Sequence, residues 1–261
     1  TTTKFEELHI LKPGISWSPD GKNIVFSAKS GETDALFILN IITNKTEKII
    51  FDLEGIFEPV WNPNNENTEI AFIGSNGKNT DIYIYNYENE NLINITNDWF
   101  SDSEISWSGN GDVLYFISNR GEYNFTNNTI DLEFLYNSSF NINNKDIYRI
   151  NKNNRKVDRI TNTDFNESYP IELKDKKSII FLSDESGINN LYIMKDMNKY
   201  PITNTITGIT QFSLDKNNNQ ILLSGLENLG YNIYKISDPK RLINNNLEIP
   251  IASWKYENLS Y

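Results

Sequence analysis

The stretch Ser16-Trp17-Ser18-Pro19-Asp20-Gly21-Lys22 opens a pattern that returns along the whole chain. It is followed by the apolar run Ile24-Val25-Phe26-Ser27, by Gly31 and by a second apolar run, Leu36-Phe37-Ile38-Leu39. Runs of β-branched and aromatic residues are typical of β-strands, and a Pro-Asp-Gly sequence is typical of a tight turn. The stretch therefore predicts short strands joined by turns.

The same order of segments recurs in four further copies. Trp61 and Trp107 mark the second and third copies, and they follow Trp17 at intervals of 44 and 46 residues. We interpret Leu173 and Phe212 as the residues that take the Trp position in copies four and five. Short fourth segments lie between the copies: Lys48-Ile49-Ile50, Leu92-Ile93-Asn94-Ile95-Thr96, Asp158-Arg159-Ile160-Thr161 and Tyr200-Pro201-Ile202-Thr203.

Four strands in each copy and a period of 40 to 50 residues predict an all-β fold, a β-propeller of four-stranded antiparallel blades. A β-helix has a shorter period, and a β-sandwich does not repeat its own sequence. We expect five blades within residues 1–243, closed by residues 5–11 as the outer strand of the last blade. The alternative is a sixth blade that opens at Trp254. Residues 244–261 are interpreted as a tail, or as a linker toward a further domain.

The repeated Ser-Trp-Ser-Pro-Asp-Gly-Lys pattern, with its Ile-Val-Phe-Ser run and a later Asp-Ile-Tyr at Asp81 and Asp146, resembles the repeats of TolB-like propellers, which are related to WD40 modules. The resemblance covers about residues 5 to 243. It implies the propeller fold, a role in docking, gating or substrate access, and an extracytoplasmic bacterial setting. It carries no catalytic residues to this sequence.

Composition and charge narrow the range of functions. The formal net charge of −11 disfavours binding to nucleic acid, because a phosphate backbone would be repelled. The absence of Cys excludes thiol chemistry and disulfides. No apolar run is long enough to span a bilayer, and a chain that begins Thr1-Thr2-Thr3 is interpreted as a processed or excised piece.

The sequence also lacks the parts of the common catalytic machineries. A Ser-His-Asp triad needs an imidazole, and the only histidine is His9, in the predicted closing strand. No Gly-x-Ser-x-Gly elbow, phosphate-binding loop or dinucleotide fingerprint occurs. We therefore expect no enzyme activity, no cofactor and no metal site. Trp17, Trp61 and Trp107 are interpreted as core residues of the blades.

Topology points to one candidate binding surface. Because strands alternate in direction, connections between blades share a face with the connections between the second and third strands of each blade. Three consecutive blades carry acidic and aromatic residues there, and an insertion at about residues 122 to 145 emerges beside them. The candidate binding residues are Phe57, Glu58, Trp99, Phe100, Asp102, Glu104, Phe165, Glu167 and Tyr169. The alternative for these residues is a solvated acidic rim.

Two functions of different classes are consistent with these features. The first is a non-catalytic scaffold that binds a protein or peptide partner, as one domain of a larger envelope-associated protein. The alternative is an accessory propeller of a prolyl-oligopeptidase-like or tricorn-like peptidase whose catalytic domain lies outside this chain.

Overall fold

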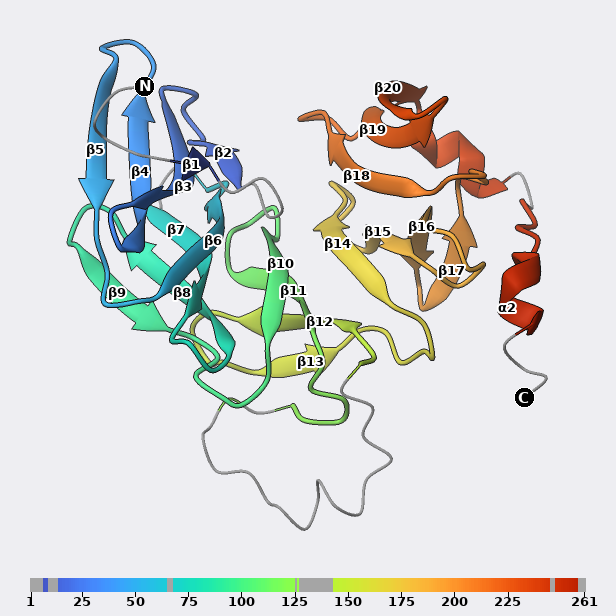
Figure 1. Ribbon diagram of the computed structural model, residues 1–261, viewed down its shortest axis with the longest axis horizontal. Coiled ribbons are helices and arrows are strands. Elements are labelled where there is room, and N and C mark those ends of the chain that lie inside the picture. Colours follow the sequence, from blue (N-terminus) through green and yellow to red (C-terminus); the bar gives the residue numbers. More distant parts are fainter. Residues whose placement is uncertain are drawn as a thin grey trace.

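The computed structural model of this chain describes residues 7–8, 14–64, 68–124, 126, 143–244 and 247–257. Five antiparallel sheets are arranged around a common centre, in the order of the sequence (Figure 1). The predicted fold class, an all-β propeller of five blades, is confirmed. Alternating Ile, Val, Phe and Tyr form the strands, because branched and aromatic side chains pack well on both faces of a pleated sheet.

The strands are short and follow one another through tight turns. Blade 1 holds β1 (Glu7–Leu8), β2 (Ile15–Trp17), β3 (Asn23–Ser30), β4 (Thr33–Asn40) and β5 (Lys45–Ile49). Blade 2 holds β6 (Gly55–Trp61), β7 (Glu69–Ser75), β8 (Thr80–Asn86) and β9 (Asn91–Asn94). Blade 3 holds β10 (Asp102–Trp107), β11 (Val113–Ser118), β12 (Asp146–Asn151) and β13 (Val157–Arg159).

The last two sheets complete the set. Blade 4 holds β14 (Glu167–Glu172), β15 (Ser178–Ser183), β16 (Asn190–Lys195) and β17 (Asn198–Pro201). Blade 5 holds β18 (Ile209–Leu214), β19 (Gln220–Glu227) and β20 (Gly230–Ser237), so it is three-stranded in the described part of the chain. A 3-10 helix, η1 (Pro239–Asn244), and a short helix, α2 (Ser253–Glu257), follow it.

The core lies between the blades rather than within one of them. Ile70 and Phe72 of β7 pack on blade 1, while Ala71 and Ile73 of the same strand pack on blade 3. Similar apolar clusters join blade 3 to blade 4 and blade 4 to blade 5. Blades 2, 3 and 4 therefore each have two apolar faces, and each is stable only when a neighbouring blade covers both of them.

The predicted burial of the three tryptophans is only partly correct. Trp61 and Trp107 are each 8% exposed, but Trp17 is 55% exposed. Trp61 packs against blade 1 and Trp107 against blade 2, whereas Trp17 lies on the face of blade 1 that points away from blade 2. Trp17 is exposed because no preceding blade covers that face among the described residues.

The assignment of the Trp position in copies four and five was wrong by one and two residues. Trp107 pairs with Leu114, and the corresponding register pairs Glu172 with Ile179 and Leu214 with Ile221. At the position that Trp107 occupies in blade 3, blade 4 has Glu172, which contacts blade 3 through hydrogen bonds instead of apolar packing. Its carboxylate accepts hydrogen bonds from the Gly109 amide (2.8 Å) and from the Tyr115 hydroxyl (3.1 Å).

The predicted closure by residues 5–11 is wrong for the part that the structure describes. Glu7 and Leu8 pair antiparallel with Lys29 and Ala28 of β3, in the first blade, and not with β20. The strand β2 covers only the first part of the inner edge of β3, so the remaining edge accepts the residues that come just before it. Pairing close in sequence costs less loop entropy than closure across the ring.

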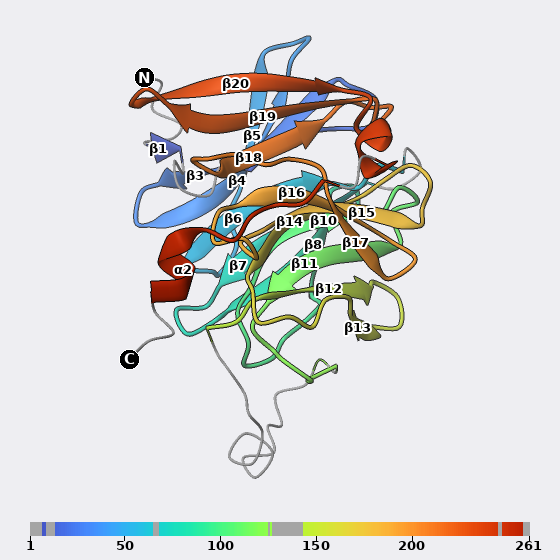
Figure 2. The ribbon, with the colours of Figure 1, turned by 90° about the vertical axis from the view of Figure 1, so that its right-hand side faces the viewer.

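The C-terminal segment runs along the outside of blade 4 (Figures 1 and 2). The Ala252 amide bonds the Ser186 carbonyl (2.7 Å), and Ile249 packs against the cluster between blades 3 and 4. Because residues 253–257 are helical, they do not open a sixth sheet. The role of residues 244–261 as a linker stays a prediction. Within the described ranges, none of the helices has the length and hydropathy needed to cross a bilayer.

The two tryptophans at equivalent positions should differ in their contribution to stability. Trp107→Ala should lower the free energy of unfolding by about 3 to 5 kcal/mol, because it leaves a cavity between blades 2 and 3. Trp17→Ala should change it by less than about 1 kcal/mol, because more than half of that side chain is already in water. Urea unfolding of both variants measures the contrast, and equal losses would contradict it.

Candidate functional site

The face predicted to carry function is formed by two kinds of connection, as the topology requires. Arg120 follows β11, and its guanidinium pairs with Asp98 in the connection between blades 2 and 3 (3.0 Å) and with Asp102 at the start of β10 (2.7 Å). Connections between blades and connections after each second strand therefore lie on one side. We call this side the loop face.

Two predicted binding residues are instead part of a buried cluster around Arg120. Asp102 is fully buried and pairs with Arg120, and Phe100 is 6% exposed, with its ring 5.6 Å from the guanidinium carbon. Tyr123 packs on the same ring, at 5.1 Å between centroids. Burial raises the pKa of Asp98, and the guanidinium of Arg120 opposes that rise. Phe100 and Asp102 hold the loop face together rather than standing open to a partner.

The other predicted aromatic residues occupy different environments. Trp99 is 64% exposed on the loop face. The ring of Phe165 is covered by the C-terminal segment, because the amine of Lys255 lies 4.1 Å from its centroid. The Lys255 amine also donates to the Glu185 carbonyl (2.7 Å), which fixes its position. Phe57 is half-buried against the core between blades 2 and 3.

Three predicted residues point toward the axis of the propeller. Glu58, Glu104 and Tyr169 occupy equivalent β-bulges in the innermost strands of blades 2, 3 and 4, each with a positive φ of 52° to 55°. Glu58 accepts a hydrogen bond from the Glu104 amide (2.5 Å), and Glu104 accepts one from the Tyr169 amide (2.8 Å). Each carboxylate thereby gives a hydrogen-bond acceptor to the backbone amide of the strained bulge residue in the next blade.

These side chains line a central hollow of 310 Å³, to which all five innermost strands contribute, from Ile15 in β2 to Phe212 in β18. Burial, followed by the negative charges of Glu104 and Glu58, raises the pKa of Tyr169 to about 12. The phenol is therefore neutral at ordinary pH and available as a hydrogen-bond donor.

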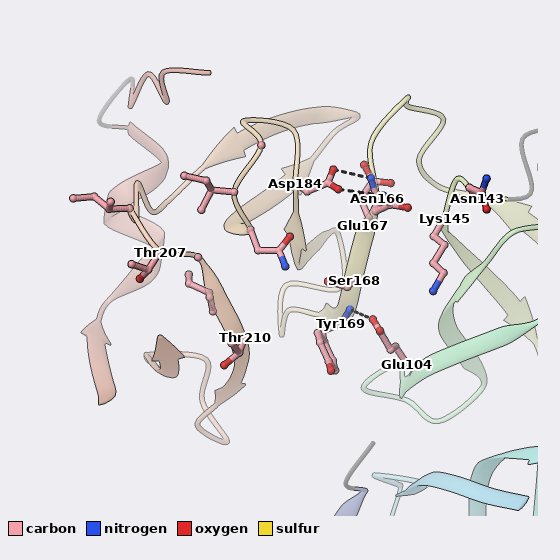
Figure 3. A pocket seen from close by; sticks show the side chains of 16 residues that line it. Glu104, Asn143, Lys145, Asn166, Glu167, Ser168, Tyr169, Asp184, Thr207 and Thr210 are labelled. Carbon is pink, nitrogen blue, oxygen red and sulfur yellow. Dashed lines mark hydrogen bonds between the residues drawn. The ribbon is translucent and has the colours of Figure 1, made fainter. Parts of the chain in front are cut away.

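A larger hollow of 850 Å³ opens on the loop face between blades 3, 4 and 5, and Figure 3 shows its lining side chains. We call it the loop-face hollow. It shares Glu104 and Tyr169 with the central hollow, so the two are continuous. The lining combines carboxylates, one amine, amides and aliphatic groups: Glu104, Glu167, Asp184, Lys145, Asn143, Asn166, Asn189, Ile188, Ile206 and Ile209.

The polar groups of the loop-face hollow are held in place by their neighbours. Asp184 accepts two hydrogen bonds from Asn166, from its amide nitrogen (2.9 Å) and from its side chain (3.1 Å) (Figure 3). Glu167 is 1% exposed and accepts bonds from the hydroxyls of Thr161 (3.0 Å) and Thr163 (2.8 Å). Burial, reinforced by the charge of Asp146, raises the pKa of Glu167 to about 7.

The predicted binding residues overlap only in part with the lining of the loop-face hollow. Glu104, Glu167 and Tyr169 line it, whereas Lys145, Asp184 and Ile206 were missed. The missed residues come from the end of the insertion and from connections of blades 4 and 5, where the acidic and aromatic composition fades. Only their position in the repeat could have indicated them, because they fall on the connections that topology assigns to the loop face.

In the ranges given above, no three or more acidic or imidazole side chains are arranged so that they could hold a metal ion. His9, the histidine weighed as a catalytic base, lies outside the described residues.

The carboxyl group of Glu167 should make the fold less stable as pH rises. Its folded pKa of about 7 exceeds its ordinary value of 4.5, so between these values the folded state binds more protons than the unfolded state. The free energy of unfolding should therefore fall as pH rises from about 4.5 to about 7. Glu167→Gln removes this titration, and urea unfolding at a series of pH values compares parent and variant. A difference that does not vary with pH would contradict the expectation.

Comparisons with known proteins agree with this architecture. Residues 5–125 match the family model described as the TolB beta propeller domain. The Tol-Pal system protein TolB of Nitratidesulfovibrio vulgaris is 33% identical over 72 residues, which are 28% of this chain and 16% of that protein.

Solved structures extend the likeness over most of the chain. TolB from Acinetobacter baumannii matches with a TM-score of 0.67 at 20% identity, over 87% of this chain and 52% of that one. A puromycin-hydrolyzing peptidase of Mycobacterium tuberculosis matches with a TM-score of 0.63 at 12% identity, over 92% of this chain and 39% of that one. This chain therefore spans about half or less of each of these proteins. Its matched residues and its five sheets thus make this chain similar to TolB β-propellers in sequence over residues 5–125 and in fold over most of its length.

Proposed function

We propose that this propeller is a non-catalytic scaffold that binds an extended peptide segment of a partner protein in the loop-face hollow. The observation that carries the proposal is the hollow itself, whose 850 Å³ suits several side chains of a bound segment. Its position between blades 3, 4 and 5, on the face where the described chain leads into and out of the insertion, is where elaborated repeat proteins usually bind.

The chemistry of the lining favours a partner with basic and polar groups. Glu104 and Asp184 supply carboxylates, and Lys145 is the one cationic group among the lining residues. The formal net charge of −11 adds a long-range attraction for a basic segment. Amide side chains beside these charges suit the main chain of a peptide, since they donate and accept hydrogen bonds at once.

The exposed side chain of Ile206 supplies an apolar contact for the bound segment. It is 90% exposed and lines both the loop-face hollow and an adjoining hollow of 530 Å³ between blades 4 and 5. A large apolar side chain in that position has no stabilising role in the free protein. Covering it on binding would add to affinity, while the surrounding carboxylates would set the orientation of the partner.

The setting of this function is proposed from the family. The relative TolB is described as a protein of the Tol-Pal system, and we propose an envelope-associated, extracytoplasmic location for this chain as part of a larger protein. An accessory role beside a peptidase domain stays a prediction, because the likeness to the peptidase structure concerns the fold alone.

Panning a random peptide display library on the parent protein tests the proposal. We expect peptides rich in Lys and Arg to be enriched, with binding that weakens as salt rises from about 0.05 M to about 0.5 M. Ile206→Arg should reduce their affinity by about tenfold or more, since it places a like charge and extra bulk at the hollow.

Ile42→Arg is the matched control. Ile42 is 69% exposed in the turn between β4 and β5, on the side opposite to the loop face, so the same substitution there should leave affinity unchanged. Equal losses in the two variants, or enrichment of peptides that bind both as tightly as the parent, would overturn the loop-face hollow as the binding site.

A further inference from the structure

The third strand of a blade is normally covered by a fourth. In blades 1 to 4 the outer edge of the third strand pairs antiparallel with β5, β9, β13 or β17. In blade 5 the sheet order is β18-β19-β20, and β20 pairs only with β19 among the described residues. Its outer edge is an eight-residue strand, Gly230–Ser237, without proline. Such an edge is a template for another strand.

The repeat shows what kind of strand fits this edge. In blades 2, 3 and 4 the fourth strand leads into the same three residues, Ile-Thr-Asn, which begin at Ile95, Ile160 and Ile202. The Ile amide donates to the carbonyl of a residue in the third strand: Ile95 to Ile82 (2.7 Å), Ile160 to Ile147 (2.8 Å) and Ile202 to Leu191 (2.8 Å). This hydrogen bond extends the pairing of the third and fourth strands past the end of the regular ladder.

The threonine of the Ile-Thr-Asn sequence makes a second, reciprocal contact. Its hydroxyl oxygen accepts the amide of the same third-strand residue, and it also bonds the Asp or Asn that precedes that residue. The amide contacts are Ile82 to Thr96 (2.9 Å), Ile147 to Thr161 (2.8 Å) and Leu191 to Thr203 (2.9 Å), and the preceding residues are Asp81, Asp146 and Asn190.

Blade 5 carries the receiving half of this arrangement. Asn232 stands opposite Gly225 in the ladder, as Asp81 stands opposite Gly74, so Asn232 and Ile233 correspond to Asp81 and Ile82. Ile82, Ile147 and Leu191 are fully buried in the apolar clusters between their blade and the next, and the Ile of the fourth segment packs in or against the same clusters. Ile233 is 79% exposed, because neither a fourth strand nor a following blade covers it among the described residues. The position that three other blades bury completely is therefore left open in blade 5.

We infer that β20 is a binding edge for an extended partner peptide that carries Ile-Thr-Asn at its C-terminal end. The peptide runs antiparallel to β20, its Thr bonds the Ile233 amide and Asn232, and its Ile covers Ile233. Main-chain hydrogen bonds supply affinity, and the Ile-Thr pair supplies register and selectivity. This edge is separate from the loop-face hollow, so the inference goes beyond the proposed function and does not depend on it.

A peptide with the sequence of residues 156–162, Lys-Val-Asp-Arg-Ile-Thr-Asn, tests the edge, because it contains the chain's own fourth strand from blade 3. It is titrated into the isotope-labelled protein, and the amide resonance of Ile233 is followed by NMR. We expect saturable shifts at Ile233. The same peptide with Val in place of Thr161 should bind at least about threefold more weakly, since it cannot form the hydroxyl contacts.

Two variants at Lys235 distinguish peptide binding through the main-chain amides of β20 from binding that depends on the side chain. The amide of Ile233 faces outward by its correspondence with Ile82, and backbone direction alternates, so the Lys235 amide faces outward as well. Lys235→Pro removes that donor without touching the ladder to β19, and it should weaken the peptide by about tenfold or more. Lys235→Thr changes the side chain but keeps the donor, and it should bind as the parent does.

Three results would overturn the inference: no saturable shift at Ile233, equal binding by parent and Lys235→Pro, or equal binding of the Thr and Val peptides. Sedimentation of the parent and Lys235→Pro addresses self-pairing. A parent dimer that becomes monomeric in Lys235→Pro would make a second copy the occupant and would also overturn the partner peptide. The Ile206→Arg variant should bind this peptide as the parent does, so failure of the loop-face hollow is recognised separately.

Discussion

Face-to-face packing between consecutive sheets is the interaction on which the rest of this structure depends. A strand such as β7 places Ile70 and Phe72 on one side and Ala71 and Ile73 on the other, and all four are fully buried. No single blade can bury both of its faces, so stability arises only when several copies stand side by side. The repeat in sequence is the direct expression of this requirement, because each copy must offer the same two faces.

The same packing creates the candidate binding surfaces as a consequence of geometry. Sheets that pack around an axis bring their innermost strands together, and the bulges at Glu58, Glu104 and Tyr169 turn three side chains toward that axis. A non-glycine residue with positive φ costs about 1 kcal/mol or more. Here the carboxylate of one bulge accepts the amide of the next, which offsets part of that cost and orients the side chains around the central hollow.

Sequence reasoning recovered the fold because the periodic pattern records the packing between blades directly. It failed where a position depends on what covers it. Trp17 has the same local sequence as Trp107, but only Trp107 has a preceding blade to cover it. The register of copy four was also misread, because Glu172 replaces an apolar ring by hydrogen bonds to blade 3, and apolar periodicity does not detect such an exchange.

The candidate site was harder to predict for a related reason. Phe100 and Asp102 have the composition of an exposed acidic and aromatic loop, yet Arg120 buries both from a different connection. Which connections meet on the loop face follows from strand direction, so the face itself was predictable. Which side chains meet there depends on loop conformation, and for that reason Lys145 and Ile206 could not be selected from the sequence.

The surfaces assigned to binding lie where the repeat is interrupted. Blade 2 follows the pattern closely, and its polar side chains bond one another, as Asp81 does with Asn94 and Thr96. Blade 3 carries the insertion, and blade 5 lacks a fourth strand among the described residues. A regular repeat satisfies its own faces and edges, so it has little left to offer a partner. An interrupted one leaves a hollow or an open edge, and the chemistry already present in the intact copies defines what fits there.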